Sequence, residues 1–182
     1  MAMQENLCIA ISGTPGSGKT SLSKLFEQNN ISVYSVKDLA EQYGCIGEID
    51  KLDGAQEIDI HRLADEWQNK ESGLIIIDGH LSHFLDVDAV VLLRCDPKNL
   101  ENRLTARGYS EQKVNANSEW ELMAGIWSEL LEFEIELPIV ELDSTKQSSE
   151  ELFKIVNDWI IDGLPYSSIS EESQIAIDWI EG

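Results

Sequence analysis

The chain is short of several features that would point to particular protein classes. Its 182 residues include three cysteines and four prolines, and no apolar run approaches the roughly 18 residues of a membrane-spanning helix. Cys8, Cys45 and Cys95 lack the paired spacing of a metal site, so we interpret them as small, buried, reduced thiols. No basic segment precedes the apolar residues Leu7–Ile11, so we expect no signal peptide and a soluble cytoplasmic protein.

Basic residues are also scarce. Lys and Arg together number 13 against 34 Asp and Glu, which gives a formal net charge of −21. Bare nucleic acid and anionic lipid repel so acidic a chain, and we therefore expect neither direct DNA binding nor membrane association. The acidic residues are spread along the chain. They indicate either a solvated surface, which composition favours, or a face that meets a basic partner.

Short apolar runs alternate with segments of helical spacing, which is typical of an α/β fold with a mostly parallel sheet. We expect strands at Leu7–Ile11, Val33–Tyr34, Leu74–Asp78, Ala89–Arg94 and Ile139–Leu142. We expect helices at Ser17–Gln28, Val36–Gln42, after a cap at Asp59, from Asp96–Pro97 to Gly108, and at Ser110–Glu136, Glu150–Ile161 and Glu171–Ile180. The stretch Tyr43–Glu57 is expected to be a loop or hairpin.

These elements predict one domain over residues 1–163, followed by a helical extension over residues 164–182. The long helix expected at 110–136 carries an apolar stripe that we assign to the core, formed by Trp120, Met123, Trp127, Leu130 and Leu131.

Residues Gly13–Thr20, Gly-Thr-Pro-Gly-Ser-Gly-Lys-Thr, match the phosphate-binding pattern G-x-x-x-x-G-K-[ST] in full. The glycines let backbone N–H groups point at phosphate oxygens, and the following helix N-terminus adds positive potential. Lys19 is placed to reach the β- and γ-phosphates, and Thr20 to offer its hydroxyl to Mg²⁺. The loop thus predicts a site for ATP or a related triphosphate with Mg²⁺. Its expected binding residues are Gly13, Pro15, Gly16, Ser17, Gly18, Lys19, Thr20 and Ser21.

Two candidate residues lie at the carboxyl end of the third expected strand. Asp78 ends that strand, where an acidic residue in nucleoside triphosphatases holds magnesium; the alternative is a cap or turn residue. His80 lies two residues later and is either structural or placed to orient a water or accept a proton.

Arg103 and Arg107 are one helical turn apart and share a helix face. Phosphoryl transfer needs cations around the developing charge, and we favour phosphate contact for both residues. The alternative is a surface helix on which they pair with Glu101 or Glu111.

The chain lacks the Asn-Lys-x-Asp segment of a GTPase and is too short for a motor or transporter ATPase. Four segments together resemble the adenylate kinase isoenzyme 6 family, in its archaeal form: Gly13–Thr20, Asp78–His80, Leu93–Pro97 and Arg103–Asn117. The resemblance extends from about Leu7 to Ile161, and the tail after Gly163 lies beyond it.

This resemblance implies a P-loop nucleoside triphosphate hydrolase fold of five parallel strands, with an AMP-binding region near residues 35–59 and a short lid near residues 108–117. It implies interconversion of ATP and AMP with two ADP, a slow ATPase activity, and a role in maturing the small ribosomal subunit through a ribosomal protein. Arg107 would contact ATP phosphates, Lys146 would lie near the adenine, and His80 is linked to ATP hydrolysis. The expected catalytic residues are Lys19, His80, Arg103 and Arg107.

One residue departs from the family pattern. Members commonly carry an arginine in the AMP-region helix, where this chain has Glu41. A carboxylate there would repel the AMP phosphate, so the acceptor must be held by another group or held poorly. The alternative function is an ATPase assembly factor that binds a small-subunit ribosomal protein and has little kinase activity.

Overall fold

The computed structural model describes residues 6–49 and 56–180, and its centre is one sheet of five parallel strands. The strands lie in the order β2-β5-β1-β6-β7. Their bounds are Asn6–Gly13 for β1, Ser32–Ser35 for β2, Gly73–Asp78 for β5, Ala89–Arg94 for β6 and Ile139–Asp143 for β7. All five expected strands are confirmed, and with them the predicted α/β P-loop fold.

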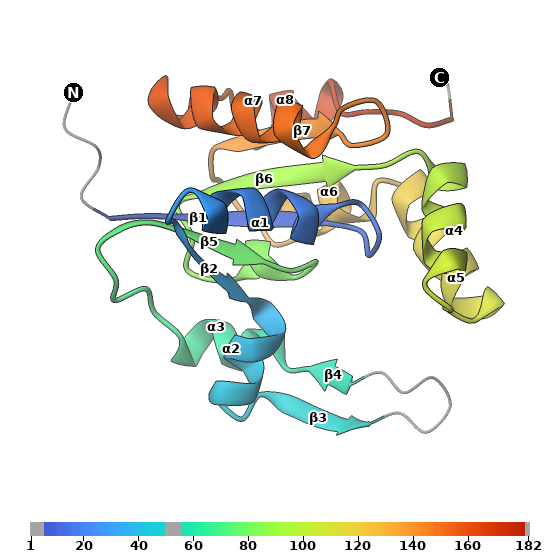
Figure 1. Cartoon of the computed structure of the whole chain (residues 1–182), viewed down its shortest axis with the longest axis horizontal. Helices are drawn as coiled ribbons and strands as arrows, with labels where there is room; N and C mark the ends of the chain where they lie inside the picture. Colours follow the sequence, from blue (N-terminus) through green and yellow to red (C-terminus); the bar gives the residue numbers. More distant parts are fainter. Residues whose placement is uncertain (1–5, 50–55, 181–182) are drawn as a thin grey trace.

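Helices cover both faces of this sheet (Figure 1). One layer is formed by α1 (Lys19–Gln28) and α7 (Ser149–Ile161), and the other by α2 (Val36–Gln42), α3 (Ile60–Glu66), α6 (Gly125–Glu132) and α8 (Ile169–Gln174). Successive residues of a strand point to opposite faces, so Cys8 and Ala10 enter one core while Ile9 and Ile11 enter the other. Burial on both faces explains why β1 is an uninterrupted apolar run.

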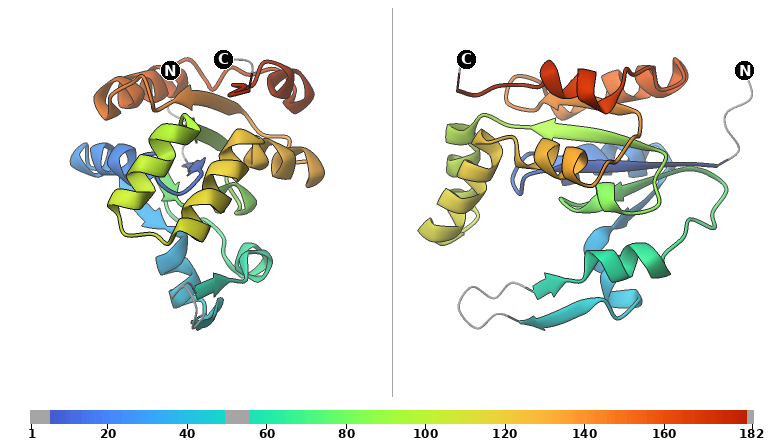
Figure 2. Two further views of the ribbon diagram at one scale, coloured as in Figure 1. Left: turned by 90° about the vertical axis from the view of Figure 1, so that its right-hand side faces the viewer. Right: turned by 180° about the vertical axis from the view of Figure 1, so that it is seen from behind.

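Two further helices stand at the carboxyl end of the sheet. They are α4 (Pro97–Ala106) and α5 (Glu111–Leu122), which lie side by side in front of the strand ends (Figure 2). The caps predicted at Asp59 and Asp96 are confirmed, since each carboxylate accepts a backbone N–H in the first turn of its helix. Within the described residues, no helix is both long and apolar enough to cross a membrane.

The segment between α2 and α3 lies outside the main sheet. It forms an antiparallel pair of β3 (Ile46–Ile49) and β4 (Gln56–Ile58), so the expected loop or hairpin is a hairpin. Both views of Figure 2 show this hairpin projecting away from the sheet. The predicted loop residues 50–55 lie outside the described residues.

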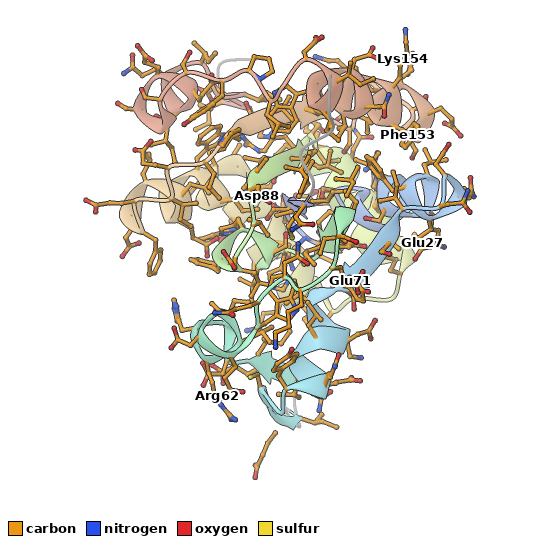
Figure 3. All side chains as sticks on the ribbon, turned by 90° about the vertical axis from the view of Figure 1, so that its left-hand side faces the viewer. Glu27, Arg62, Glu71, Asp88, Phe153 and Lys154 are labelled. Atoms are coloured by element: carbon orange, nitrogen blue, oxygen red, sulfur yellow. The ribbon has the colours of Figure 1, made fainter. Side chains whose placement is uncertain are left out.

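Asp88 connects two strands at the amino end of the sheet. Figure 3 shows it among the strands, whereas Arg62 and Lys154 lie on the outer helices α3 and α7. Its carboxylate accepts from the Cys8 backbone N–H, with an N···O distance of 2.7 Å. Burial and this carboxylate raise the pKa of the Cys8 thiol to about 12. All three cysteines are buried and unpaired, as predicted.

The single long helix predicted over Ser110–Glu136 is wrong. The chain forms α5 and α6 instead, separated at Ala124, whose φ of 51° and ψ of 46° are left-handed. The break follows from packing, because Gly125 lies against the Trp120 ring so closely that a Cβ there would be 2.1 Å away. Of the predicted apolar stripe, Trp127 and Leu130 are buried, while three other side chains are exposed: Trp120, Met123 and Leu131.

The helix predicted over Glu171–Ile180 is also misplaced. Helix α8 begins earlier, where Ser168 and Glu171 form a reciprocal capping box, and it ends at Gln174. The helix does not continue through Ile177, whose backbone N–H donates to the Glu141 carboxylate instead of to a carbonyl of the preceding turn, and the indole N–H of Trp179 donates to the buried Glu121 carboxylate.

The left-handed alanine gives a stability test. We expect Ala124→Gly to raise the free energy of unfolding by about 0.5 kcal/mol, because the strain of roughly 1–2 kcal/mol outweighs the entropic cost of glycine. Urea denaturation would measure the change. The matched control is Ala116→Gly on the exposed face of α5, where glycine should cost about 1 kcal/mol. Equal losses in both variants would contradict the assigned conformation.

Candidate functional site

The phosphate-binding loop connects β1 to α1 at the carboxyl end of the sheet. Gly13 has a φ of 152°, and a Cβ at this position would lie 2.5 Å from the Leu93 carbonyl oxygen of the neighbouring strand. Gly18, which precedes the first turn of α1, has a φ of 99°. Side chains are excluded at the first position by contact and disfavoured at the second by backbone conformation, which accounts for the glycines of the motif.

Lys19 folds back over this loop. Its Nζ donates hydrogen bonds to the carbonyl oxygens of Gly13 and Thr14, at 2.7 and 3.0 Å. Burial lowers the pKa of Lys19 to about 8; Asp78 opposes the shift, while the nearby Arg107 charge adds to it. A poorly solvated ammonium held beside a second cation would gain energy from an anionic ligand.

Asp78 ends β5, directly beside Ile11 of β1. Burial raises the pKa of its carboxyl, whereas the Lys19 charge and the hydroxyls of Thr20 and Ser23 act in the opposite direction. The predicted metal ligands Thr20 and Asp78 are therefore close neighbours. Across residues 6–49 and 56–180 no three His, Cys, Asp or Glu side chains cluster as metal ligands, so a cation here would need further oxygens from phosphate or water.

His80 lies beside the same loop. Partial desolvation by the groups around the ring, and secondarily the Lys19 charge, lower the pKa of its imidazole to about 4, although the residue as a whole is exposed to solvent. The ring is therefore neutral near pH 7 and has the form needed to accept a proton. His83 is different, since its Nδ1 lies 2.9 Å from the Ser12 hydroxyl and its side chain is buried.

A cavity of about 750 Å³ joins these groups. Four cations line it: Lys19, Lys37, Arg107 and Lys113. Asp78 is the one carboxylate among the lining residues that the structure describes. The other expected site residues on this cavity are Pro15, Gly16, Gly18, Thr20, Ser21 and His80. An anion would thus find a strongly positive site in a chain whose net charge is −21.

The remaining expected residues do not line this cavity. Gly13 and Ser17 lie in the buried part of the loop. Arg103 donates from Nη1 to the Gly16 carbonyl at 3.2 Å and from Nη2 to the Ser144 carbonyl at 3.1 Å. It braces the phosphate-binding loop against the loop after β7, while its alternative partner Glu101 accepts a hydrogen bond from Ser118.

Lys146 lies in the loop after β7 and lines a second cavity beyond Ser144. Its Nζ is 3.5 Å from the Asp143 carboxylate, and its side chain is largely exposed.

Sequence reasoning missed a buried ionic cluster beneath the loop. Arg94, 1% exposed, donates from Nε to Glu121 and from Nη1 to Glu141, each at 2.6 Å. The second oxygen of Glu121 accepts from the hydroxyl of Thr14, which is part of the phosphate-binding motif. A charged residue that closes the apolar strand Ala89–Arg94 was a usable signal, because central parallel strands are buried on both faces.

The chain is similar over most of its length to curated archaeal proteins. Residues 9–124 match the AAA domain family. Proteins named "putative adenylate kinase" are 39% identical in Archaeoglobus fulgidus, over 82% of this chain and 80% of that protein, and 44% identical in Thermococcus onnurineus, over 80% and 79%. A protein of the same name in Pyrococcus abyssi is 38% identical over 96% of this chain and 92% of its own length.

Solved structures agree on the fold. Shikimate kinase from Acinetobacter baumannii superposes with a TM-score of 0.60 at 15% identity, over 88% of this chain and 96% of that chain. At that identity the likeness supports the P-loop kinase fold alone. The curated relatives carry the assignment further: the chain belongs to the archaeal family named "putative adenylate kinase", as its motifs predicted.

Proposed function

We propose that the protein is a Mg²⁺-dependent adenylate kinase that converts ATP and AMP into two molecules of ADP. One observation carries the proposal: four cations line a single cavity of about 750 Å³ on a chain with a net charge of −21. Two phosphate-bearing substrates would need such a site, because their charges must be brought together before transfer.

The donor half of the site is assigned to the phosphate-binding loop. The backbone of Gly13–Thr20 would hold the β- and γ-phosphates, with Lys19 and Arg107 compensating the charge that develops during transfer. Thr20 and Asp78 supply oxygen donors beside the phosphate site, which suits Mg²⁺, and the bound ion would neutralise phosphate charge. No strong base is required, because positioning and electrostatics supply most of the rate.

The acceptor half is assigned to the side of the cavity formed by α2 and the β3–β4 hairpin. Lys37 lines the cavity there, one helical turn before Glu41, and its Nζ is 3.8 Å from the Glu41 carboxylate. Lys37 therefore offers the cation that position 41 lacks. We assign it to the AMP phosphate, with Glu41 orienting the ammonium instead of meeting the substrate.

The second proposed activity is ATP hydrolysis, in which water takes the place of AMP as the acceptor. His80 is neutral and lies near Lys19, so it has the protonation state to orient a water towards the γ-phosphate. The related alternative is an ATPase whose nucleotide state sets its affinity for a basic ribosomal protein, which a chain of net charge −21 would attract.

The kinase proposal predicts that purified protein with Mg²⁺, ATP and AMP forms ADP at a rate that depends on AMP. A coupled assay or chromatography of the nucleotides would measure it. Lys19→Met is the control and should abolish the reaction, because it removes the loop cation. ADP formation at the same rate without AMP would reject the kinase and favour the ATPase alternative.

The acceptor assignment predicts that Lys37→Ala raises the KM for AMP by about tenfold, since a hydrogen bond to a charged phosphate group is worth roughly 1.5 kcal/mol. The KM for ATP should change little. Steady-state kinetics with each substrate varied would separate the two effects. Lys24→Ala, an exposed lysine of α1 away from the cavity, is the matched control and should leave both constants unchanged. An equal rise for ATP would argue against Lys37 as an acceptor ligand.

The His80 assignment predicts that His80→Ala loses AMP-independent ATP hydrolysis and keeps AMP-dependent ADP formation. Because the pKa of His80 is lowered in the free protein, kcat/KM for wild-type hydrolysis should show no inflection near pH 6.5 and should fall only as the pH approaches about 4. Initial rates across this range would test both statements. Equal loss of the two activities would place His80 in transfer itself, not in water activation.

A further inference from the structure

The second cavity, of about 740 Å³, lies beside the phosphate-binding loop and is not used by the phosphate chemistry above. One side is formed by residues at the start of α4 and in the loop after β7, including Asn99, Thr145, Lys146 and Gln147. The other side is formed by the C-terminal segment Ile177–Trp179. This segment has no role in the proposed transfer.

Ser144 lies between the two cavities, because Gly18 lines the first and its own chain neighbours Asp143 and Thr145 line the second. A Cβ at Gly18 would lie 4.0 Å from the Cβ of Ser144, and Arg103 bonds the carbonyls of both Gly16 and Ser144. The terminal phosphate of a bound triphosphate belongs near Lys19, Asp78 and His80. The nucleoside at the opposite end of the phosphate chain must then leave the loop elsewhere, and the cavity beyond Ser144 has room for it.

The C-terminal segment is fixed at this cavity by buried partners. The Ile177 N–H donates to Glu141 at 2.8 Å, and its carbonyl accepts from Arg94 Nη1 at 3.2 Å. The indole N–H of Trp179 donates to Glu121 at 3.0 Å. Figures 1 and 2 show the chain after α8 running to the end of the sheet that carries α4 and α5.

The position of the Trp179 side chain suits stacking of its ring on a ligand. Its N–H is satisfied at Glu121, and the Arg94 guanidinium carbon lies 5.8 Å from the ring centroid. The residue is half-buried and lines the cavity. An aromatic side chain with a satisfied polar atom and a fixed position is a platform on which a nucleobase can stack, since every base has a π-face.

We propose that Ile177–Trp179 forms the outer wall of the nucleobase site of the donor nucleotide, with the Trp179 ring stacking on the base. The inference rests on the proposed function, because it assumes that the triphosphate binds at Gly13–Thr20. It gives the C-terminal extension a role in substrate binding: the extension completes a site whose other wall comes from the loop after β7.

A competing role for the same tryptophan makes a different prediction. Trp179 and Thr14 bind the same carboxylate, that of Glu121, so the indole could act only by positioning the phosphate-binding loop. Loss of that role would weaken every phosphate ligand equally. Loss of a base platform weakens only a ligand that has a base.

The test compares Mg²⁺-ATP with Mg²⁺-tripolyphosphate by calorimetry on the full-length protein. Trp179→Ala should weaken ATP about tenfold, the size of one aromatic–base stack, and leave tripolyphosphate within about twofold. Trp179→Phe keeps a ring without the N–H and should retain most of the ATP affinity. Trp120→Phe, an exposed tryptophan of α5 that lines neither cavity, is the matched control and should change neither ligand.

Tryptophan fluorescence gives a second measurement on folded protein. ATP should quench wild type and Trp120→Phe, tripolyphosphate should not, and the quenching by ATP should be lost in Trp179→Phe. Equal weakening of both ligands in Trp179→Ala, or unchanged ATP affinity, would overturn the base platform while the phosphate site stands. If wild type binds neither ligand, the proposed function fails together with the inference.

Discussion

The buried charge of Arg94 constrains the whole carboxyl end of this molecule. A guanidinium removed from water must be surrounded by acceptors, and removing one partner of a buried pair typically costs about 3–5 kcal/mol. Here the acceptors come from three separate elements: Glu121 of α5, Glu141 of β7 and the carbonyl of Ile177 in the tail. The need to satisfy one cation therefore fixes α5, β7 and the tail relative to β6.

The same cluster connects the fold to the phosphate-binding loop. Glu121 accepts from Thr14 with one oxygen and from Arg94 and Trp179 with the other. Arg103 adds a second brace between the loop and Ser144. The donor half of the site is thus supported by groups that are buried or partly buried and hydrogen-bonded, which is the condition for a preorganised electrostatic site.

The acceptor half is built differently. Helix α2 and the β3–β4 hairpin lie outside the main sheet (Figure 1), and Lys37 and Glu41 are both exposed. A cation can shift by one helical turn on such an element without disturbing the core. On the proposed assignment, Lys37 would therefore bind the AMP phosphate from the same helix that carries Glu41.

The predictable parts of the structure were those set by local sequence. The loop Gly13–Thr20 and the apolar strands follow from short patterns, and so does the proximity of Asp78 and His80 to the loop, because parallel strands end at one edge. Arg103 was predicted to contact phosphate, whereas its bonds to the carbonyls of Gly16 and Ser144 could not be read from a helix face. The helix break at Ala124 was missed because the apolar pattern continues through it. The packing of Trp120 on Gly125 sets the position of the break.

The tail was missed for a different physical reason. Residues 175–180 follow a short helix, and their conformation is set by partners far away in the chain. Ile177 bonds Glu141, 36 residues earlier, and Trp179 bonds Glu121, 58 residues earlier. Glu121 itself looked like an ordinary polar residue of an amphipathic helix. Its partner Arg94 carried a signal, but nothing in the sequence paired the two.

The contrast between the cationic cavity and the acidic remainder of the chain has a consequence for competing ligands. Fields from individual charges decay over about 8 Å at physiological ionic strength, so a single nucleotide inside the cavity responds mainly to the four lining cations. A long RNA or DNA strand would extend beyond the cavity and meet the repulsion of a chain whose net charge is −21. We therefore expect this charge distribution to act as a size filter for anions, which favours small phosphates at the loop over those of a long nucleic acid.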